Sequence, residues 1–159
     1  MAFTVREIIV IAISIEEAGY DFYIRSGGKF NDPAIKDVFD FLAREELAHK
    51  EIFRALLRKD EADAIIPDEL TAYLKTIGGI RVFGGNRMDP DQIVSGINKP
   101  IDAIRHAFDN EKESILFYSE MKELYPADGE TTSLLDRIIA EERKHVIALV
   151  SLAEKIRLM

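Results

Sequence analysis

Two of the three histidines in this sequence follow a glutamate at the same spacing. Residues 45–49 read EELAH and residues 141–145 read EERKH, so Glu46 and His49 recur as Glu142 and His145. On a helix, residues three positions apart share a face, and a carboxylate beside an imidazole can bind a transition metal. A lone Glu-x-x-His is most often a solvated surface pair, whereas a matched recurrence favours a metal site.

The segments before these motifs contain a second repeat. Residues 16–23 read EEAGYDFY and residues 111–118 read EKESILFY, so Glu16 and Tyr23 recur as Glu111 and Tyr118. The sequence therefore predicts two helical hairpins of similar pattern. The first helix of each hairpin offers one glutamate, and the second offers Glu-x-x-His.

The neighbours of these residues are mostly apolar. Three and four positions from Glu16, for example, stand Ala12, Ile13, Gly19 and Tyr20, and the one basic residue at such a position around the four glutamates is Lys50, four after Glu46. Burying one unpaired carboxylate costs several kcal/mol, so four together need cations. Two divalent metals would balance their charge. The predicted ligands of this dinuclear site are Glu16, Glu46, His49, Glu111, Glu142 and His145, with the adjacent Glu17, Glu45, Glu113 and Glu141 as alternatives of register.

The ligand types limit the metal. The chain has no cysteine, which excludes a disulfide, a thiolate site and a cysteine-bound iron centre. Carboxylate oxygen and imidazole nitrogen suit iron or manganese, and zinc can enter such a site. Carboxylates that bridge two metals would hold them about 3.5–4 Å apart.

Four long segments with apolar residues at helical spacing are expected to position these groups. The first runs from about Thr4 to Ser26, and the second begins at Asp32-Pro33. The third runs from Lys99-Pro100 to the break at Tyr125-Pro126, and the fourth begins near Gly129. The run of isoleucine and valine at 8–15 also suits a buried strand, but the helical pattern continues beyond it.

Residues 60–98 form a long connection between the second and third predicted helices. They contain one segment that predicts a short helix, Pro67–Thr76, followed by the glycine pairs Gly78-Gly79 and Gly84-Gly85 and by breaks at Pro90 and Gly96. In a four-helix bundle a connection of this length is a crossover between two helices that point the same way. We therefore expect residues 1–159 to form a single all-α domain, a four-helix bundle with a long crossover between helices two and three.

Charge and hydrophobicity indicate which partners the protein can have. The net charge of −8 and the pI near 5.0 leave no basic stripe for nucleic acid. The apolar run at 8–15 is too short to span a membrane and lacks a following cleavage site, so a cytoplasmic protein is expected. Because this run is apolar on every side, it predicts a homodimer that packs through the first helix.

The order Glu, Glu-x-x-His, Glu, Glu-x-x-His on four helices resembles the ferritin-like di-iron carboxylate family. The phrases EEAGYDFY, EELAHKEIF, EKESILFY and EERKHV are most similar to its rubrerythrin-like and bacterial ferritin-like branches. The resemblance implies two iron ions, each bound by one of the two histidines. It leaves open whether Glu16 and Glu142 ligate one end or cap one metal each while Glu111 and Glu46 bridge. It also implies Tyr23 and Tyr118 as candidate catalytic residues that hold ligand carboxylates by hydrogen bonds.

Four departures from the family pattern narrow the expected activity and assembly. Rubrerythrins carry a cysteine-bound iron and a further glutamate three residues after the ligand of the third helix, where this chain has Ser114. Bacterioferritins bind haem through a methionine after the glutamate of the second helix, where this chain has Leu47, so no haem is expected. No clear fifth helix of a ferritin shell follows the fourth, which favours a small oligomer over a cage.

The resemblance implies an oxidoreductase whose di-iron centre reacts with hydrogen peroxide or dioxygen. As a peroxidase it would need an external electron donor, because the chain offers no second redox site. The alternative is a ferroxidase or iron-handling protein, in which iron itself is the substrate. A second alternative is a metal-binding bundle without redox turnover, and a hydroxylase of a larger organic substrate would use similar ligands.

Overall fold

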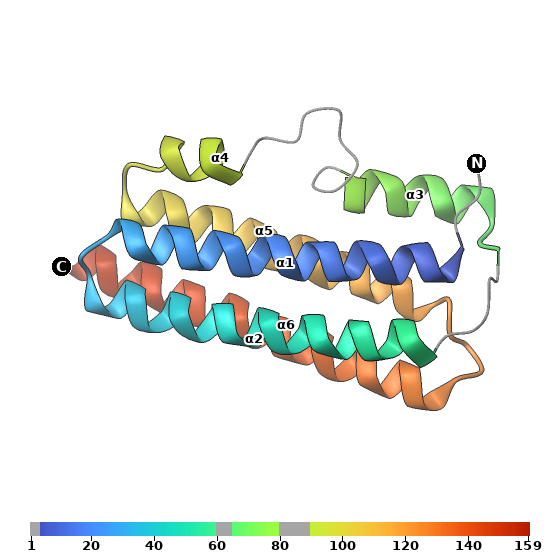
Figure 1. The fold of residues 1–159 in the computed structure, drawn as a ribbon. Coiled ribbons are helices and arrows are strands. Elements are labelled where there is room, and N and C mark those ends of the chain that lie inside the picture. Colours follow the sequence, from blue (N-terminus) through green and yellow to red (C-terminus); the bar gives the residue numbers. More distant parts are fainter. Residues whose placement is uncertain (1–3, 60–64, 80–89) are drawn as a thin grey trace.

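The computed structural model of the chain describes residues 4–59, 65–79 and 90–159. Four long helices lie side by side as a bundle, and two short helices belong to the connection across it (Figure 1). The described residues contain no strand, only an isolated bridge between Thr4 and Ile65. The predicted all-α four-helix bundle with a long crossover is therefore confirmed. The helices are α1 (Val5–Lys29), α2 (Pro33–Lys59), α3 (Asp68–Gly79), α4 (Pro90–Gly96), α5 (Pro100–Lys122) and α6 (Gly129–Leu158).

Helix α1 begins at a capping box, in which the Thr4 hydroxyl accepts from the Glu7 amide and the Glu7 carboxylate accepts from the Thr4 amide. The run at 8–15 is helical rather than a strand. The predicted end at Ser26 is wrong, because the helix continues through both glycines to Lys29. Gly27 is buried there, and a Cβ at this position would lie 3.3 Å from the Cβ of Phe39. The glycine thus permits close packing of α1 on α2.

The two helices of the crossover lie on one side of the bundle, with α3 near one end and α4 near the other (Figure 1). Ile66 and Leu74 are buried in the same hydrophobic cluster as Ile8 and Ile9 of α1. Pro90 begins helix α4 instead of only breaking the chain, because proline fits the first turn of a helix. The pair Gly84-Gly85 lies outside the described residues.

The burial of residues 8–15 bears on the predicted homodimer. Within the run at 8–15, Val10 is the one residue classed as exposed, at 47%, while Ile8, Ile9 and Ile11 are 0–1% exposed. These residues of α1 are therefore buried within the chain, in a hydrophobic cluster that includes Ile66 and Leu74 of the crossover. A homodimer through α1 stays a prediction, but the burial of this run does not require one.

The core consists of two hydrophobic clusters. One gathers residues 5–15 of α1 with 53–56, 117–121 and 135–139. The other gathers residues 22–23 of α1 with 35–43, 97–107 and 149–152. On every long helix the predicted metal ligands fall between these two sets, so the polar residues form a layer midway along the bundle.

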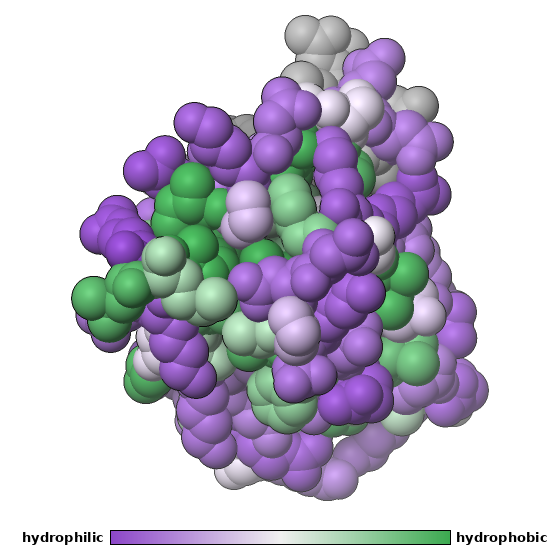
Figure 2. Space-filling model, turned by 90° about the vertical axis from the view of Figure 1, so that its left-hand side faces the viewer, coloured by the Kyte–Doolittle hydropathy of each residue, from purple (hydrophilic) through white to green (hydrophobic). Residues whose placement is uncertain are grey.

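The outer surface shows hydrophobic patches between hydrophilic side chains at the end of the bundle where the C-terminus lies (Figure 2). A shallow hollow between α5 and α6 is lined by Ile101, Ile104, Arg105, Phe108, Asp109, Leu149, Val150, Ala153 and Arg157. Among the described residues, none of the helices combines the length and the apolar character that crossing a membrane requires.

Candidate metal centre

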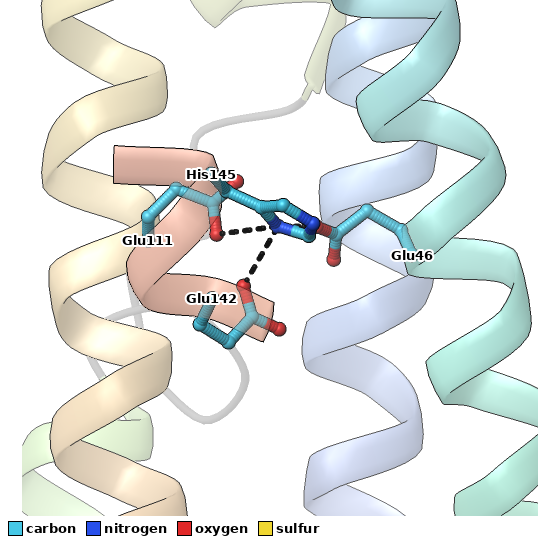
Figure 3. A group of neighbouring side chains, drawn as sticks. All are labelled: Glu46, Glu111, Glu142 and His145. Carbon is cyan, nitrogen blue, oxygen red and sulfur yellow. Dashed lines mark hydrogen bonds and ion pairs between the residues drawn. The ribbon is translucent and has the colours of Figure 1, made fainter. Parts of the chain in front are cut away.

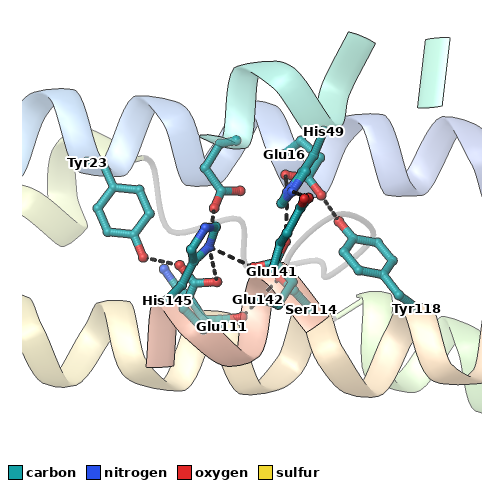
Figure 4. A network of polar contacts seen from close by, with 11 residues as sticks. Glu16, Tyr23, His49, Glu111, Ser114, Tyr118, Glu141, Glu142 and His145 are labelled. Carbon is teal, nitrogen blue, oxygen red and sulfur yellow. Dashed lines mark hydrogen bonds and ion pairs between the residues drawn. The ribbon is translucent and has the colours of Figure 1, made fainter. Parts of the chain in front are cut away.

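The structure brings all six predicted ligands into one buried layer. Glu16 comes from α1 and Glu111 from α5, while α2 and α6 each contribute a Glu-x-x-His pair (Figure 4). None of the six is more than 4% exposed. Their burial follows from the apolar neighbours one turn away on each helix, which pack into the two core clusters on either side.

Ligand atoms of these residues form two groups in which all atoms lie within 4.8 Å of one another. The larger group is Glu46, Glu111, Glu142 and His145 (Figure 3). The smaller group is Glu16, His49 and Glu142. Glu142 belongs to both groups, so one carboxylate links the two candidate metal positions.

Both imidazoles turn Nδ1 toward the centre. His49 Nδ1 lies 3.0 Å from Oε1 of Glu142 and 3.7 Å from Oε2 of Glu16. His145 Nδ1 lies 3.1 Å from Oε2 of Glu142. It also lies 3.5 Å from Oε2 of Glu111 and 3.7 Å from Oε1 of Glu46. The Glu142 carboxylate therefore stands between the two histidines with one oxygen toward each.

Several inward-facing atoms of the centre lack a hydrogen-bond partner. These buried atoms include Oε2 of Glu16, Oε1 of Glu46, Oε1 of Glu142 and Nδ1 of His49. Within the described residues, no lysine or arginine forms an ion pair with any of the four glutamates, although buried carboxylates are normally paired. Unpaired oxygen and nitrogen donors around one point are what two cations would satisfy, and this donor set fits iron or manganese.

The pKa values of the four carboxyl groups also indicate that the centre needs positive charge. Burial, followed by repulsion from neighbouring carboxylates, raises the pKa of Glu16 and Glu46 well above the ordinary value. Burial and Glu142 raise the pKa of Glu111 to about 8. Glu142 differs, because contacts with Glu111 and both histidines outweigh burial and lower its pKa. Without metal, the centre therefore holds protons on most of its carboxylates.

The pKa values of the two histidines are raised, although burial alone would lower them. Burial acts to lower the pKa of His49, but Glu142 and other carboxylates around it raise that pKa to about 9. In the same way, Glu111 and Glu142 raise the pKa of His145 to about 10 against the effect of burial. Metal ligation requires the imidazole to lose the proton from the ligating nitrogen, so protons and metal compete for this site.

Two tyrosines cross from one hairpin to the other. The Tyr23 hydroxyl of α1 donates to Oε1 of Glu111 on α5, and the Tyr118 hydroxyl of α5 donates to Oε1 of Glu16 on α1 (Figure 4). Burial and the nearby carboxylates raise the pKa of both tyrosines well above the ordinary value. Both side chains therefore remain protonated donors at neutral pH.

Comparison with known proteins agrees with this geometry. The Rubrerythrin family model matches residues 7–76. A crystal structure from Thermotoga maritima, of a protein assigned as a ferritin-like diiron-carboxylate protein, is similar over 97% of both chains with a TM-score of 0.75 and 25% identity. An uncharacterized protein of Archaeoglobus fulgidus is 38% identical over 60 residues, which make up 38% of this chain and 92% of that protein. The chain belongs to the ferritin-like di-iron carboxylate family.

The family predicted from the sequence is thus confirmed, and metal binding by the centre follows from it. The matched span 7–76 contains all but the first two residues of the α1–α2 hairpin and most of α3. It therefore includes Glu16, Glu46 and His49. The second hairpin repeats these residue types, and the similarity to the ferritin-like structure extends over both hairpins.

The sequence prediction did not identify the role of Glu141 in this ferritin-like centre. Its carboxylate accepts a hydrogen bond from Nε2 of His49 at 2.9 Å, so it holds the edge of the ring that points away from the centre. The sequence offered Glu141 only as an alternative register of the ligand Glu142. The two partners are 92 positions apart on different helices, and no local pattern joins them.

Gly19 was also missed as a part of the centre. It lies on α1 three residues after Glu16, and a Cβ at this position would lie 2.7 Å from Oε2 of Glu46. The Glu46 carboxylate therefore occupies the space that any other side chain would fill. The signal in the sequence was a residue without a side chain on the face of α1 that carries the ligand.

The remaining glutamates beside the ligands lie outside both groups of donors. Glu17 is exposed and pairs with Lys50 at 2.7 Å, while Glu45 and Glu113 are partly buried. The structure therefore favours the predicted register over the three alternatives Glu17, Glu45 and Glu113.

Proposed function

We propose that this protein is a di-iron oxidoreductase that reduces hydrogen peroxide or dioxygen. One observation carries the proposal: four carboxylates and two imidazoles share a buried layer, and no lysine or arginine of residues 4–59, 65–79 and 90–159 forms an ion pair with these carboxylates. The proposed ligands are Glu16, Glu46, His49, Glu111, Glu142 and His145.

The residues divide into two sets around the shared carboxylate. Glu16 and His49 would hold one metal, and Glu111 with His145 the other, while Glu142 would be shared and Glu46 would lie with the second set. Two irons supply the redox chemistry when bound, since each can give up one electron. Two such electrons and two protons convert hydrogen peroxide into two molecules of water.

The protein's own part is to position the ligands and to keep the layer dry. Tyr23 and Tyr118 each fix one oxygen of a glutamate, which leaves the second oxygen of that glutamate for metal. The two hydrophobic clusters exclude water from both ends of the layer. An external electron donor must restore the reduced state, because the chain has no cysteine and its described residues hold no second group of donors for a further redox centre.

The hollow between α5 and α6 does not favour hydroxylation of a large organic substrate. Its lining contains none of the six proposed ligands and belongs to the end of the bundle rather than to the middle layer. A small oxidant is the substrate class that a closed polar layer accepts most readily.

The test begins with an anaerobic titration of metal-free protein with ferrous ion. We expect a sharp break at two irons per chain, lost in His145→Ala and retained in His106→Ala, which changes an exposed histidine on α5. The absence of a break at two, or the same break in both variants, would refute the dinuclear site.

The loaded protein is then mixed separately with hydrogen peroxide and with dioxygen. Faster oxidation by peroxide, with turnover when a reductant is supplied, would support the peroxidase. Faster oxidation by dioxygen with release of ferric ion would support the ferroxidase instead. Binding without oxidation by either would leave a metal-binding bundle and exclude the oxidoreductase.

A further inference from the structure

The two histidines of the centre have different surroundings on the side that faces away from it. Nε2 of His49 lies 2.9 Å from a carboxylate oxygen of Glu141. Nε2 of His145 is buried and has no hydrogen-bond partner among the described residues. The two rings are otherwise alike, since they stack with centroids 5.8 Å apart and both turn Nδ1 inward.

The repeat in the sequence makes this difference unexpected. Glu141 stands immediately before Glu142, and its counterpart in the first hairpin is Glu45, immediately before Glu46. If the halves were equivalent, Glu45 would hold His145 as Glu141 holds His49. Glu45 instead makes no hydrogen bond or ion pair within the part of the chain that the structure describes. The ring of Phe41 lies against His145, edge to face with centroids 6.1 Å apart.

We infer that Glu141 is a positioning residue for His49 alone, so that the two metal positions depend on different parts of the protein. This inference rests on the proposed two-metal site. When Nδ1 ligates a metal, Nε2 carries the remaining proton of the ring and donates it to an acceptor. A carboxylate acceptor fixes the ring and makes the ligating nitrogen more basic. The His49 position has this support, whereas the His145 position relies on packing by Phe41.

The difference matches the number of ligands in each group. The group around His145 has three carboxylates, whereas the group around His49 has two. Glu141 therefore supports the position that has fewer carboxylates of its own. Its side chain is 29% exposed, so the carboxylate keeps contact with solvent and adds its charge to the centre at a lower desolvation cost than a fully buried group.

The test compares Glu141→Ala with the matched variant Glu45→Ala. Metal-free protein is titrated anaerobically with ferrous ion, and the dissociation constants of the two binding steps are measured. We expect Glu141→Ala to weaken one step about 10–100-fold, as is typical for loss of an outer partner of a ligating histidine, and to leave the other step unchanged. Glu141→Gln keeps an acceptor oxygen and should fall between wild type and alanine. Glu45→Ala should change neither step.

Equal effects of Glu141→Ala and Glu45→Ala, or no effect of either, would overturn the inference while leaving the two-metal site intact. Failure of the unaltered protein to bind two irons would instead refute the proposed function and this inference together. The unfolding midpoint of each metal-free variant serves as the control for folding, because a general loss of structure would weaken both steps and not one.

Discussion

The two hairpins, α1–α2 and α5–α6, contribute the same residue types to the centre but hold them differently. In the first hairpin, Gly19 leaves a space that the carboxylate of Glu46 fills. In the second hairpin the counterpart of Gly19 is Ser114, whose hydroxyl donates to the Asn110 carbonyl of its own helix. The glutamate that follows the same pattern there, Glu142, stands between the two histidines.

This comparison teaches that a repeated ligand set does not make two equal metal positions. The repeat fixes which side chains face the centre, because it fixes their place on each helix. The freedom of each ligand is decided by neighbours that do not repeat, such as a glycine in one half and a serine in the other. The tests that follow separate the shared features of the halves from those that belong to one.

The largest effect is expected from the carboxylate that both halves share. Glu142→Gln keeps the shape of the side chain but removes its charge from both groups of donors. We expect both binding steps for ferrous ion to weaken on the order of 100-fold, since each ligand of a four-ligand site supplies roughly 3 kcal/mol. Glu16→Gln should weaken only one step.

The measurement is an anaerobic titration that resolves the two steps, with Glu154→Gln on the exposed face of α6 as the control. If Glu16→Gln weakened both steps as much as Glu142→Gln does, the assignment of Glu142 as the shared residue would be wrong.

A smaller effect is expected from Gly19→Ala. The added Cβ would meet Oε2 of Glu46 at 2.7 Å, so the carboxylate must move. Because the end of a glutamate side chain is flexible, the fold should tolerate this, and alanine itself favours a helix over glycine by up to about 1 kcal/mol. We therefore expect metal affinity to fall about 10-fold while stability in urea is unchanged or slightly higher.

The matched variant is Ser114→Ala, which loses only a hydrogen bond to its own helix. Metal affinity of this variant should stay within about 2-fold of the unaltered protein, as for an exposed or locally bonded side chain. A loss of affinity equal to that of Gly19→Ala would show that the halves respond alike, and would contradict the comparison.

The smallest effect is expected in the pH dependence of the stability of the metal-free protein. It tests whether the two hairpins, each with one histidine, hold protons alike when no metal is bound. The pKa values of Glu111, His49 and His145 are raised to about 8, 9 and 10. A raised pKa in the folded state stabilises below the unfolded value, and this stability is lost as pH rises through the folded value. The metal-free protein should therefore become less stable between pH 6.5 and pH 10.

We expect the unfolding temperature of the metal-free protein to fall by about 5 °C or more across this range, since 1 kcal/mol corresponds to about 2–4 °C for a chain of this size. Differential scanning calorimetry on chelated protein measures it, and nuclear magnetic resonance of the imidazoles follows each histidine. A constant or rising unfolding temperature would contradict the proton-holding state of the centre.

Much of the centre could be predicted because helices convert spacing into direction. Glu46 and His49, three residues apart on a strongly periodic helix, had to share a face, and the repeat of the pattern required the same of Glu142 and His145. The all-α fold followed from the length and period of the segments. These features depend on residues that are near one another in the sequence.

The features that were missed depend on how the helices sit against each other. Helix α1 passes through Gly27 because Phe39 of another helix packs against it, although glycine alone favours an end. The apolar run at 8–15 predicts a partner copy, because the sequence does not show that this run and Leu74 of the crossover belong to one hydrophobic cluster. The contact of Glu141 with His49 likewise depends on the register between α2 and α6.

The hydrogen bonds that close the centre also determine how the two hairpins are joined. The pairs Tyr23–Glu111, His49–Glu141 and Tyr118–Glu16 connect residues 88, 92 and 102 positions apart. A cross-link that closes a loop of about 100 residues reduces the entropy of the unfolded chain by the equivalent of about 4–5 kcal/mol at 25 °C. This chain has no cysteine with which to form a disulfide. Metal ions bound by ligands of both hairpins would cross-link the same distant segments. They would stabilise the bundle as well as supply its reactive group.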